Sequence, residues 1–134
     1  MTTKVIPLLI NGEEIPSDIT FDVVNPASGE VVFRANGANS KLTEAAVDAA
    51  QNAFPAWSRT KPNHRRALFF KAAQLLDERQ DEVVKIQMDE TSVDPGFAGG
   101  FQVAMSIGML QECGSRTSSI EGAIPEPDEE GIHR

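Results

Sequence analysis

The chain has 134 residues, 40% of them hydrophobic, so its length allows one domain of ordinary globular composition at most. Its formal net charge of −8 argues against nucleic acid and anionic membrane surfaces as partners, because phosphate binding requires a basic face. No apolar run approaches the roughly 20 residues of a membrane-spanning helix. The single cysteine cannot form an internal disulfide, which is typical of a reducing compartment, so we expect a cytoplasmic protein.

Two β-hairpins are predicted near the amino terminus. Residues 1–7 are expected to be a flexible end, too short and too poorly patterned for a signal peptide. Residues 8–15 predict the first hairpin, because the dipeptide Asn11-Gly12 favours the backbone angles of a two-residue turn. A strand over residues 19–24 is predicted to follow.

The second hairpin prediction centres on residues 21–33. Two runs rich in β-formers, 21–24 and 31–33, flank the segment Asn25-Pro26-Ala27-Ser28-Gly29. Pro26 fixes its own φ and favours extended geometry at Asn25, while Gly29 accepts the positive φ that ends a tight turn. By itself this pattern predicts a hairpin and no function.

The remainder of the chain predicts three helices. The first has Asn39 or Ser40 as its cap and an alanine-rich face, and it ends at Pro55 with Trp57 in the connection that follows. The second runs from residue 63 to about residue 90, on the order of 40 Å. Its apolar stripe is formed by Leu68, Ala72, Leu75, Leu76, Val83 and Ile86.

The third helix is predicted over residues 97–113, and glycines weaken its pattern. Its apolar residues are Phe97, Phe101, Ala104, Met105 and Leu110. Residues 123–134 are acidic and carry prolines, so they predict a tail in loop conformation.

Taken together, four features occur in a familiar order: the Asn11-Gly12 hairpin, the Asn25-Pro26 turn, residues 49–57, and the long helix ending in Glu90-Thr91. In this order and spacing the chain resembles the amino-terminal part of the aldehyde dehydrogenase superfamily, over about residues 9–122, in a salicylaldehyde dehydrogenase-like form. The resemblance implies an α/β family fold. This chain would hold an incomplete amino-terminal part of it, small β-hairpins followed by three α-helices, without the Rossmann-type sheet. After Glu90-Thr91 the chain departs from the Gly-Lys-Pro that is usual in the family.

The resemblance implies oxidation of an aldehyde to a carboxylic acid with NAD or NADP. This chemistry requires a cysteine thiolate that attacks the aldehyde, a nicotinamide that accepts the hydride, and a glutamate that activates water. In the family these groups lie downstream of the matched segment. We therefore predict no catalytic, cofactor-binding or metal-binding residue here, and expect the chain alone to be inactive.

Two alternatives to a truncated enzyme are open. The first is a non-catalytic interaction protein that associates with itself, or with a longer relative, through its apolar helix faces. The second is a degenerate gene product, or a wrongly predicted gene, without a role.

Several single residues carry side chains that could act as functional groups. Cys113 lies in Gln111-Glu112-Cys113-Gly114 and lacks the glycine-glutamine-cysteine order of the family nucleophile, so it is expected to be a buried structural residue. His64 is expected at the surface or in helix packing, and His133 in a disordered end. The tail acids lack the spacing of a calcium-binding loop and predict a solvated segment; they are Glu126, Asp128, Glu129 and Glu130.

A cation site is implied by the resemblance alone. Many family members hold a monovalent cation through backbone carbonyls, at positions that correspond to Val24 and Glu90 in this chain. The remaining ligand would lie outside the matched segment, so no metal site is assigned.

Overall fold

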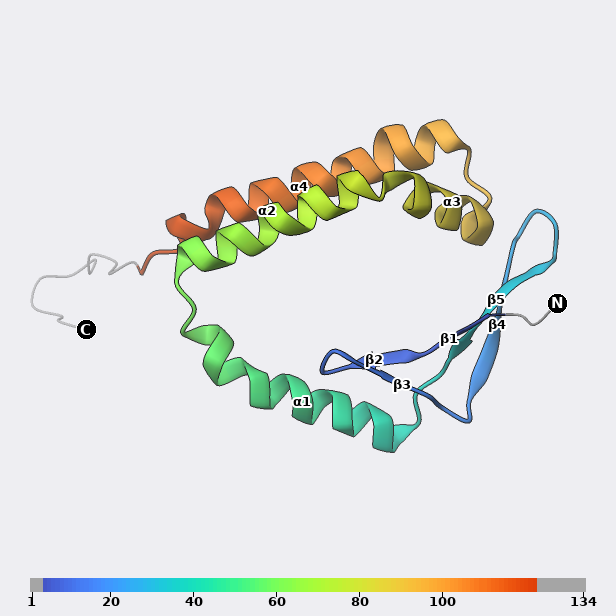
Figure 1. Ribbon diagram of the computed structural model, residues 1–134, viewed down its shortest axis with the longest axis horizontal. Coiled ribbons are helices and arrows are strands. Elements are labelled where there is room, and N and C mark those ends of the chain that lie inside the picture. The colour runs from blue at the N-terminus through green and yellow to red at the C-terminus, as the bar shows by residue number, and fades with distance from the viewer. Residues whose placement is uncertain (1–3, 123–134) are drawn as a thin grey trace, which may run out of the picture.

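The computed structural model describes residues 4–122, with strands at one end of the molecule and helices extending from them along two sides (Figure 1). The strands are β1 (Val5–Ile6), β2 (Leu8–Ile10), β3 (Glu13–Ile15), β4 (Thr20–Val24) and β5 (Val31–Asn36). The helical elements are α1 (Ser40–Ser58), α2 (Pro62–Glu78), α3 (Gln80–Thr91), the π-helix η1 (Gly96–Val103), α4 (Ala104–Arg116) and the 3₁₀ turn η2 (Thr117–Ser119). Within these residues no helix is both long and apolar enough to cross a membrane.

The first predicted hairpin is confirmed as a two-stranded antiparallel sheet of β2 and β3. Leu8 pairs with Ile15 and Ile10 with Glu13. Asn11 and Gly12 have φ angles of 53° and 81°, the positive values that a two-residue hairpin turn requires at both central positions.

The second predicted hairpin is confirmed as β4 and β5, but a third strand joins it. β5 lies between β4, its antiparallel partner, and β1, which runs parallel to it. Val5 and Ile6 are thus held by backbone pairing, whereas the sequence analysis placed them in a flexible end. The sequence gives no sign of this strand, because its partner lies about 29 residues further along the chain and the strand itself has two residues.

The turn between β4 and β5 is held by its own first residue. The Asn25 side-chain oxygen accepts hydrogen bonds from the backbone N–H groups of Ala27 (2.9 Å) and Ser28 (3.0 Å). The Gly29 N–H donates to the Asn25 carbonyl at 2.8 Å, and Gly29 has a φ of 73°. This segment therefore forms the rigid, glycine-ended turn that the sequence predicts.

Helix α1 begins as predicted but continues beyond its proline. The side chain of Asn39 caps it by accepting the N–H of Leu42 at 2.9 Å. Pro55 was expected to end the helix, yet Pro55 and Trp57 both lie inside it. No residue of α1 is fully buried, so water can reach the carbonyl that a proline leaves without its usual partner.

Arg65 stabilises the extra turn of α1 from the neighbouring helix. Its Nη2 donates to the carbonyls of Trp57 (2.9 Å) and Ser58 (3.0 Å), and its Nε donates to Thr60 Oγ1 (2.7 Å). The guanidinium carbon also lies 5.3 Å from the centre of the Trp57 ring. A cation at a helix carboxyl end is favourable, because it meets the unpaired carbonyls there.

The long second helix of the sequence analysis is in fact two helices, so residues 4–122 contain four α-helices rather than three. The break is at Arg79, with φ −112° and ψ 16°. Arg79 occupies the next position of the apolar stripe, four residues after Leu75 and four before Val83. A charged group cannot extend the stripe, and instead it pairs with Glu82 at 2.8 Å in the first turn of α3.

The best-packed region of the molecule is the antiparallel contact between α2 and α4 (Figure 1). Gly114 is buried where α4 approaches Phe69 and Phe70 of α2. Among residues 4–122 the fully buried apolar residues are few, namely Ala73 of α2 and Ala98 and Val103 of η1.

Helix α2 contacts α4 through a different face from the predicted stripe. Ala73 is buried and Phe69 and Leu76 are half-buried, so the contact face runs one residue later than Leu68, Ala72 and Leu75. Leu68 and Leu75 remain 47% and 44% exposed. Of the predicted stripe, Leu76 thus belongs to the contact face and Val83 of α3 is half-buried, whereas Leu68, Ala72 and Leu75 form a neighbouring apolar face that is exposed within residues 4–122.

Candidate functional site

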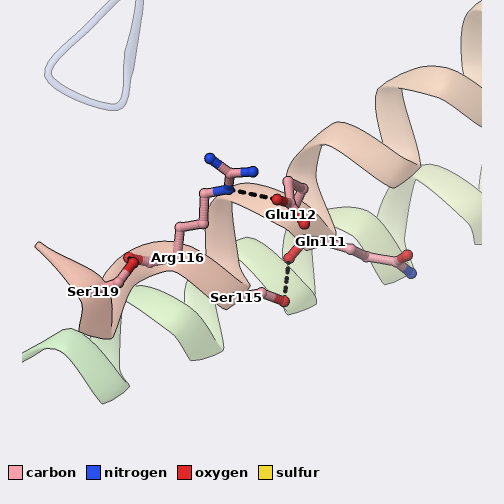
Figure 2. Close-up of polar contacts among 5 residues, drawn as sticks. All are labelled: Gln111, Glu112, Ser115, Arg116 and Ser119. Carbon is pink, nitrogen blue, oxygen red and sulfur yellow. Dashed lines mark hydrogen bonds and ion pairs between the residues drawn. The ribbon is translucent and has the colours of Figure 1, made fainter.

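Cys113 lies on α4, exposed to solvent, which corrects the expectation that it is buried. The residue that faces α2 is its neighbour Gly114, and the next position on a helix is turned away by about 100°. Figure 2 shows polar contacts of the residues that flank Cys113 in sequence: Arg116 reaches back along α4 to Glu112, and Ser115 Oγ donates to the Gln111 carbonyl at 2.9 Å. The nearby cation is thus already paired with a carboxylate, an arrangement that does not favour a reactive thiolate.

The histidines do not add a partner for this thiol. His64 lies in the first turn of α2, exposed, and its backbone N–H donates to Asn63 Oδ1 at 2.8 Å. His133 and the acids of residues 126–130 lie outside the described residues. Among residues 4–122, no group of three or more His, Cys, Asp or Glu side chains is placed to hold a metal ion.

The two carbonyl positions of the implied cation site lie beside a direct contact between hairpin and helix. Val24 precedes Asn25, and Glu90 stands two residues before Ser92, whose hydroxyl donates to the Asn25 side-chain oxygen at 2.9 Å. This long-range contact was not predicted. The sequence feature that could have indicated this contact is the serine directly after Glu90-Thr91, at a position where the resembled family usually has glycine.

A hollow of about 510 Å³ opens between the three-stranded sheet and α3. Ile6, Val32, Phe33 and Ile86 supply an apolar lining, and Lys4, Asp89 and Glu90 supply charged groups. The charged groups are of both signs, and no thiol, hydroxyl or imidazole lines the hollow, so its mostly apolar lining has the character of an unfilled packing space rather than that of a reaction site.

One strand-to-helix connection lies within residues 4–122, from β5 to α1, and it is not the glycine-rich turn of a dinucleotide-binding site. A nicotinamide dinucleotide is held where a glycine-rich turn leads from a strand of a parallel sheet into a helix. The corresponding strand-to-helix connection here, from β5 to α1, has one glycine, Gly37. A Cβ at Gly37 would lie 2.8 Å from Cγ2 of Ile19, so the glycine provides room for this chain's own side chain. The Leu42 N–H, at the start of α1, is already taken by Asn39.

Comparisons with known proteins agree on one family. The model of the aldehyde dehydrogenase family matches residues 15–133. Vanillin dehydrogenase from Pseudomonas fluorescens is 37% identical over 128 residues, which are 94% of this chain and 26% of that protein. A 1-pyrroline-5-carboxylate dehydrogenase from Bacillus subtilis is 41% identical over 80 residues, 59% of this chain and 16% of that protein.

The fold has the same relatives among solved structures. Salicylaldehyde dehydrogenase from Pseudomonas putida G7, solved with salicylaldehyde, superposes with a TM-score of 0.86 at 27% identity, covering 97% of this chain and 27% of that one. The NAD+ complex of an aldehyde dehydrogenase from Bacillus cereus gives a TM-score of 0.87 at 25% identity, covering 93% and 26%. The chain thus spans about a quarter of the length of these relatives.

Proposed function

Because the chain belongs to the aldehyde dehydrogenase family, we propose that it is the amino-terminal scaffold of an enzyme that oxidises an aldehyde to a carboxylic acid with NAD or NADP. We propose further that a polypeptide of these 134 residues does not catalyse the reaction by itself. The names of two relatives, vanillin dehydrogenase and salicylaldehyde dehydrogenase, favour an aromatic aldehyde. The lone thiol favours a reducing compartment such as the cytoplasm.

One observation carries this proposal: among residues 4–122, the single thiol of the chain has no partner for the chemistry. Cys113 is exposed on α4, and the adjacent cation, Arg116, is bound to Glu112. Nucleophilic attack on an aldehyde needs a thiolate activated by a base or a positive charge, together with donors for the developing oxyanion. The residues around Cys113 supply neither, so we assign this segment a supporting role.

The inactivity of the chain alone is tested directly. Purified chain is mixed with vanillin or salicylaldehyde and with NAD or NADP, and formation of reduced nicotinamide is followed. We expect none, and no saturable heat of binding for either nucleotide by calorimetry, whereas the vanillin dehydrogenase of Pseudomonas fluorescens serves as the positive control. Saturable binding of either nucleotide to the chain would overturn this part of the proposal.

The scaffold role is tested by exchange of segments. The matching amino-terminal quarter of the vanillin dehydrogenase is replaced by residues 8–122 of this chain. If these residues are a working scaffold, the chimera folds and oxidises vanillin. A chimera that melts cooperatively, like its parent, and yet has no activity would refute the role.

A second candidate function, a protein that docks on a partner, is favoured by the uncovered apolar side chains. Phe97 and Phe101 stack with ring centres 5.2 Å apart and are 44% and 50% exposed. Leu68 and Leu75 of α2 are also exposed, at 47% and 44%, and exposed apolar surface of this kind, here on η1 and α2, is a sign of an interface. The proposed partner is a longer member of the same family. Co-purification with such a relative, abolished by Phe101→Ser, would support this function, and association only between copies of this chain would contradict it.

A further inference from the structure

The strand part and the helical part of the molecule are joined by a small set of polar contacts. Within residues 4–122, every hydrogen bond between residues 4–38, the strand part, and residues 61–122, the helical part, involves Ser92. Its Oγ donates to Asn25 Oδ1 at 2.9 Å and accepts the N–H of Ala27 at 3.2 Å. These two contacts, here called the Ser92 bridge, connect positions 67 and 65 residues apart.

The backbone of Ser92 is in a conformation that serine seldom adopts. Ser92 ends α3 with φ 56° and ψ 25°, in the left-handed region, and its N–H donates to the Met88 carbonyl at 2.9 Å. Glycine is the usual residue there, because a Cβ in this region is sterically unfavourable. The hydroxyl is the compensating feature, since glycine would form the same helix end but no bridge.

The acceptor of the Ser92 hydroxyl, the side chain of Asn25, is held in place by hydrogen bonds within its own turn. Asn25 Oδ1 already accepts the N–H groups of Ala27 and Ser28, which orient the turn before the hydroxyl of Ser92 reaches it. Elsewhere α3 packs chiefly on η1 and α2, the other elements of the helical part. The hollow of about 510 Å³ lies between α3 and the sheet that the bridge connects.

We propose that Ser92 is a positioning residue, which holds the turn of the β4–β5 hairpin on the carboxyl end of α3 and so sets the angle between the strand part and the helical part. The width of the hollow between them depends on this angle. The bridge acts through hydrogen bonds exposed to solvent, so each contributes modestly, and their effect lies in orientation more than in overall stability.

The first test measures the turn itself, by hydrogen exchange and mass spectrometry of the complete chain. Ser92→Ala removes the hydroxyl and keeps the strained backbone, and we expect peptides covering residues 25–29 to exchange about two- to tenfold faster. Ser106→Ala is the matched control, because the Ser106 hydroxyl donates at 2.8 Å to Gln102 of the same helical segment and crosses to no other part. Equal exchange in the turn for both variants would overturn the proposal.

The second test measures orientation, which a merely local contact would not change. Spin labels are placed on the exposed native Cys113 of α4 and on a Thr20→Cys substitution in β4, and the labelled chain is diluted with unlabelled chain. We expect a broader distribution of label-to-label distances in Ser92→Ala and in Ser92→Gly, and an unchanged one in Ser106→Ala. In Asn25→Asp, which keeps an acceptor oxygen, the narrow distribution should be retained. A distribution for Ser92→Gly as narrow as that of the unchanged chain would show that the helix end, and not the hydroxyl, sets the angle.

Discussion

The packing of α4 on α2 predicts opposite effects on stability for two glycine-to-alanine substitutions in α4. A Cβ added at Gly114 would lie 3.1 Å from Phe69 Cβ and 3.1 Å from two ring carbons of Phe70. A Cβ added at Gly108, in the same helix, would have no atom within 4 Å apart from its chain neighbours and the backbone of its own helix. Both are glycine-to-alanine changes in one helix, so their difference isolates the packing.

The magnitudes follow from two known effects. Alanine stabilises a helix interior by roughly 0.5–1 kcal/mol relative to glycine, and this gain is the whole expected effect of Gly108→Ala. In Gly114→Ala an overpacking cost of about 1–3 kcal/mol opposes it. The Phe70 ring is partly exposed and can rotate, but Phe69 Cβ is attached to the backbone and can move only with α2. We therefore expect Gly114→Ala to destabilise the helical pair by about 0.5–2 kcal/mol.

Hydrogen exchange of the α4 amides is the appropriate assay, because it reports local opening and does not require a two-state melt. We expect slower exchange in Gly108→Ala and faster exchange in Gly114→Ala, with circular dichroism confirming that both variants remain helical. Equal slowing of exchange in both variants would refute the packing of Gly114 on α2.

Three further outcomes are expected. The isolated chain should give a helical spectrum, a broad melt, binding of a hydrophobic dye and self-association, because Leu68, Leu75, Phe97 and Phe101 are about half exposed and each forgoes about half of the roughly 1.5–3 kcal/mol that full burial contributes; a sharp melt of a monodisperse monomer would contradict this. Cys113→Ser should leave these properties unchanged, and the native thiol should react with a maleimide at the rate of an ordinary exposed cysteine; a much faster reaction would reveal an activating neighbour. Arg65→Lys should increase hydrogen exchange of the amides in the last turn of α1. One ammonium group cannot donate to the carbonyls of Trp57 and Ser58 and to the Thr60 hydroxyl in the same geometry. Unchanged hydrogen exchange there would show that these hydrogen bonds do not hold the turn.

The features that the sequence alone determined are the local ones. Asn11-Gly12 and Gly29 specify positive φ angles, and Asn39 specifies a helix start, because these preferences act between residues close together in the chain. The order and spacing of four segments, namely Asn11-Gly12, Asn25-Pro26, residues 49–57 and Glu90-Thr91, also identified the family, and the family model confirms it. That the chain offers no assembled catalytic centre is still a prediction, for which the activity and binding experiments are the test.

Only the tertiary structure decided how these pieces meet. The parallel strand β1, the turn of α1 that continues past Pro55 with Arg65 on its carbonyls, and the choice of the Ala73 face for packing against α4 each depend on a partner distant in sequence. Periodicity shows that α2 is apolar, but two neighbouring faces satisfy the pattern, and the close approach of Gly114 selects one of them. The same approach leaves Cys113 exposed. In the sequence alone, Ser92 is an unfavourable residue for the end of a helix. Its hydrogen bond to Asn25, 67 residues away, exists only because the fold places the two side chains next to each other.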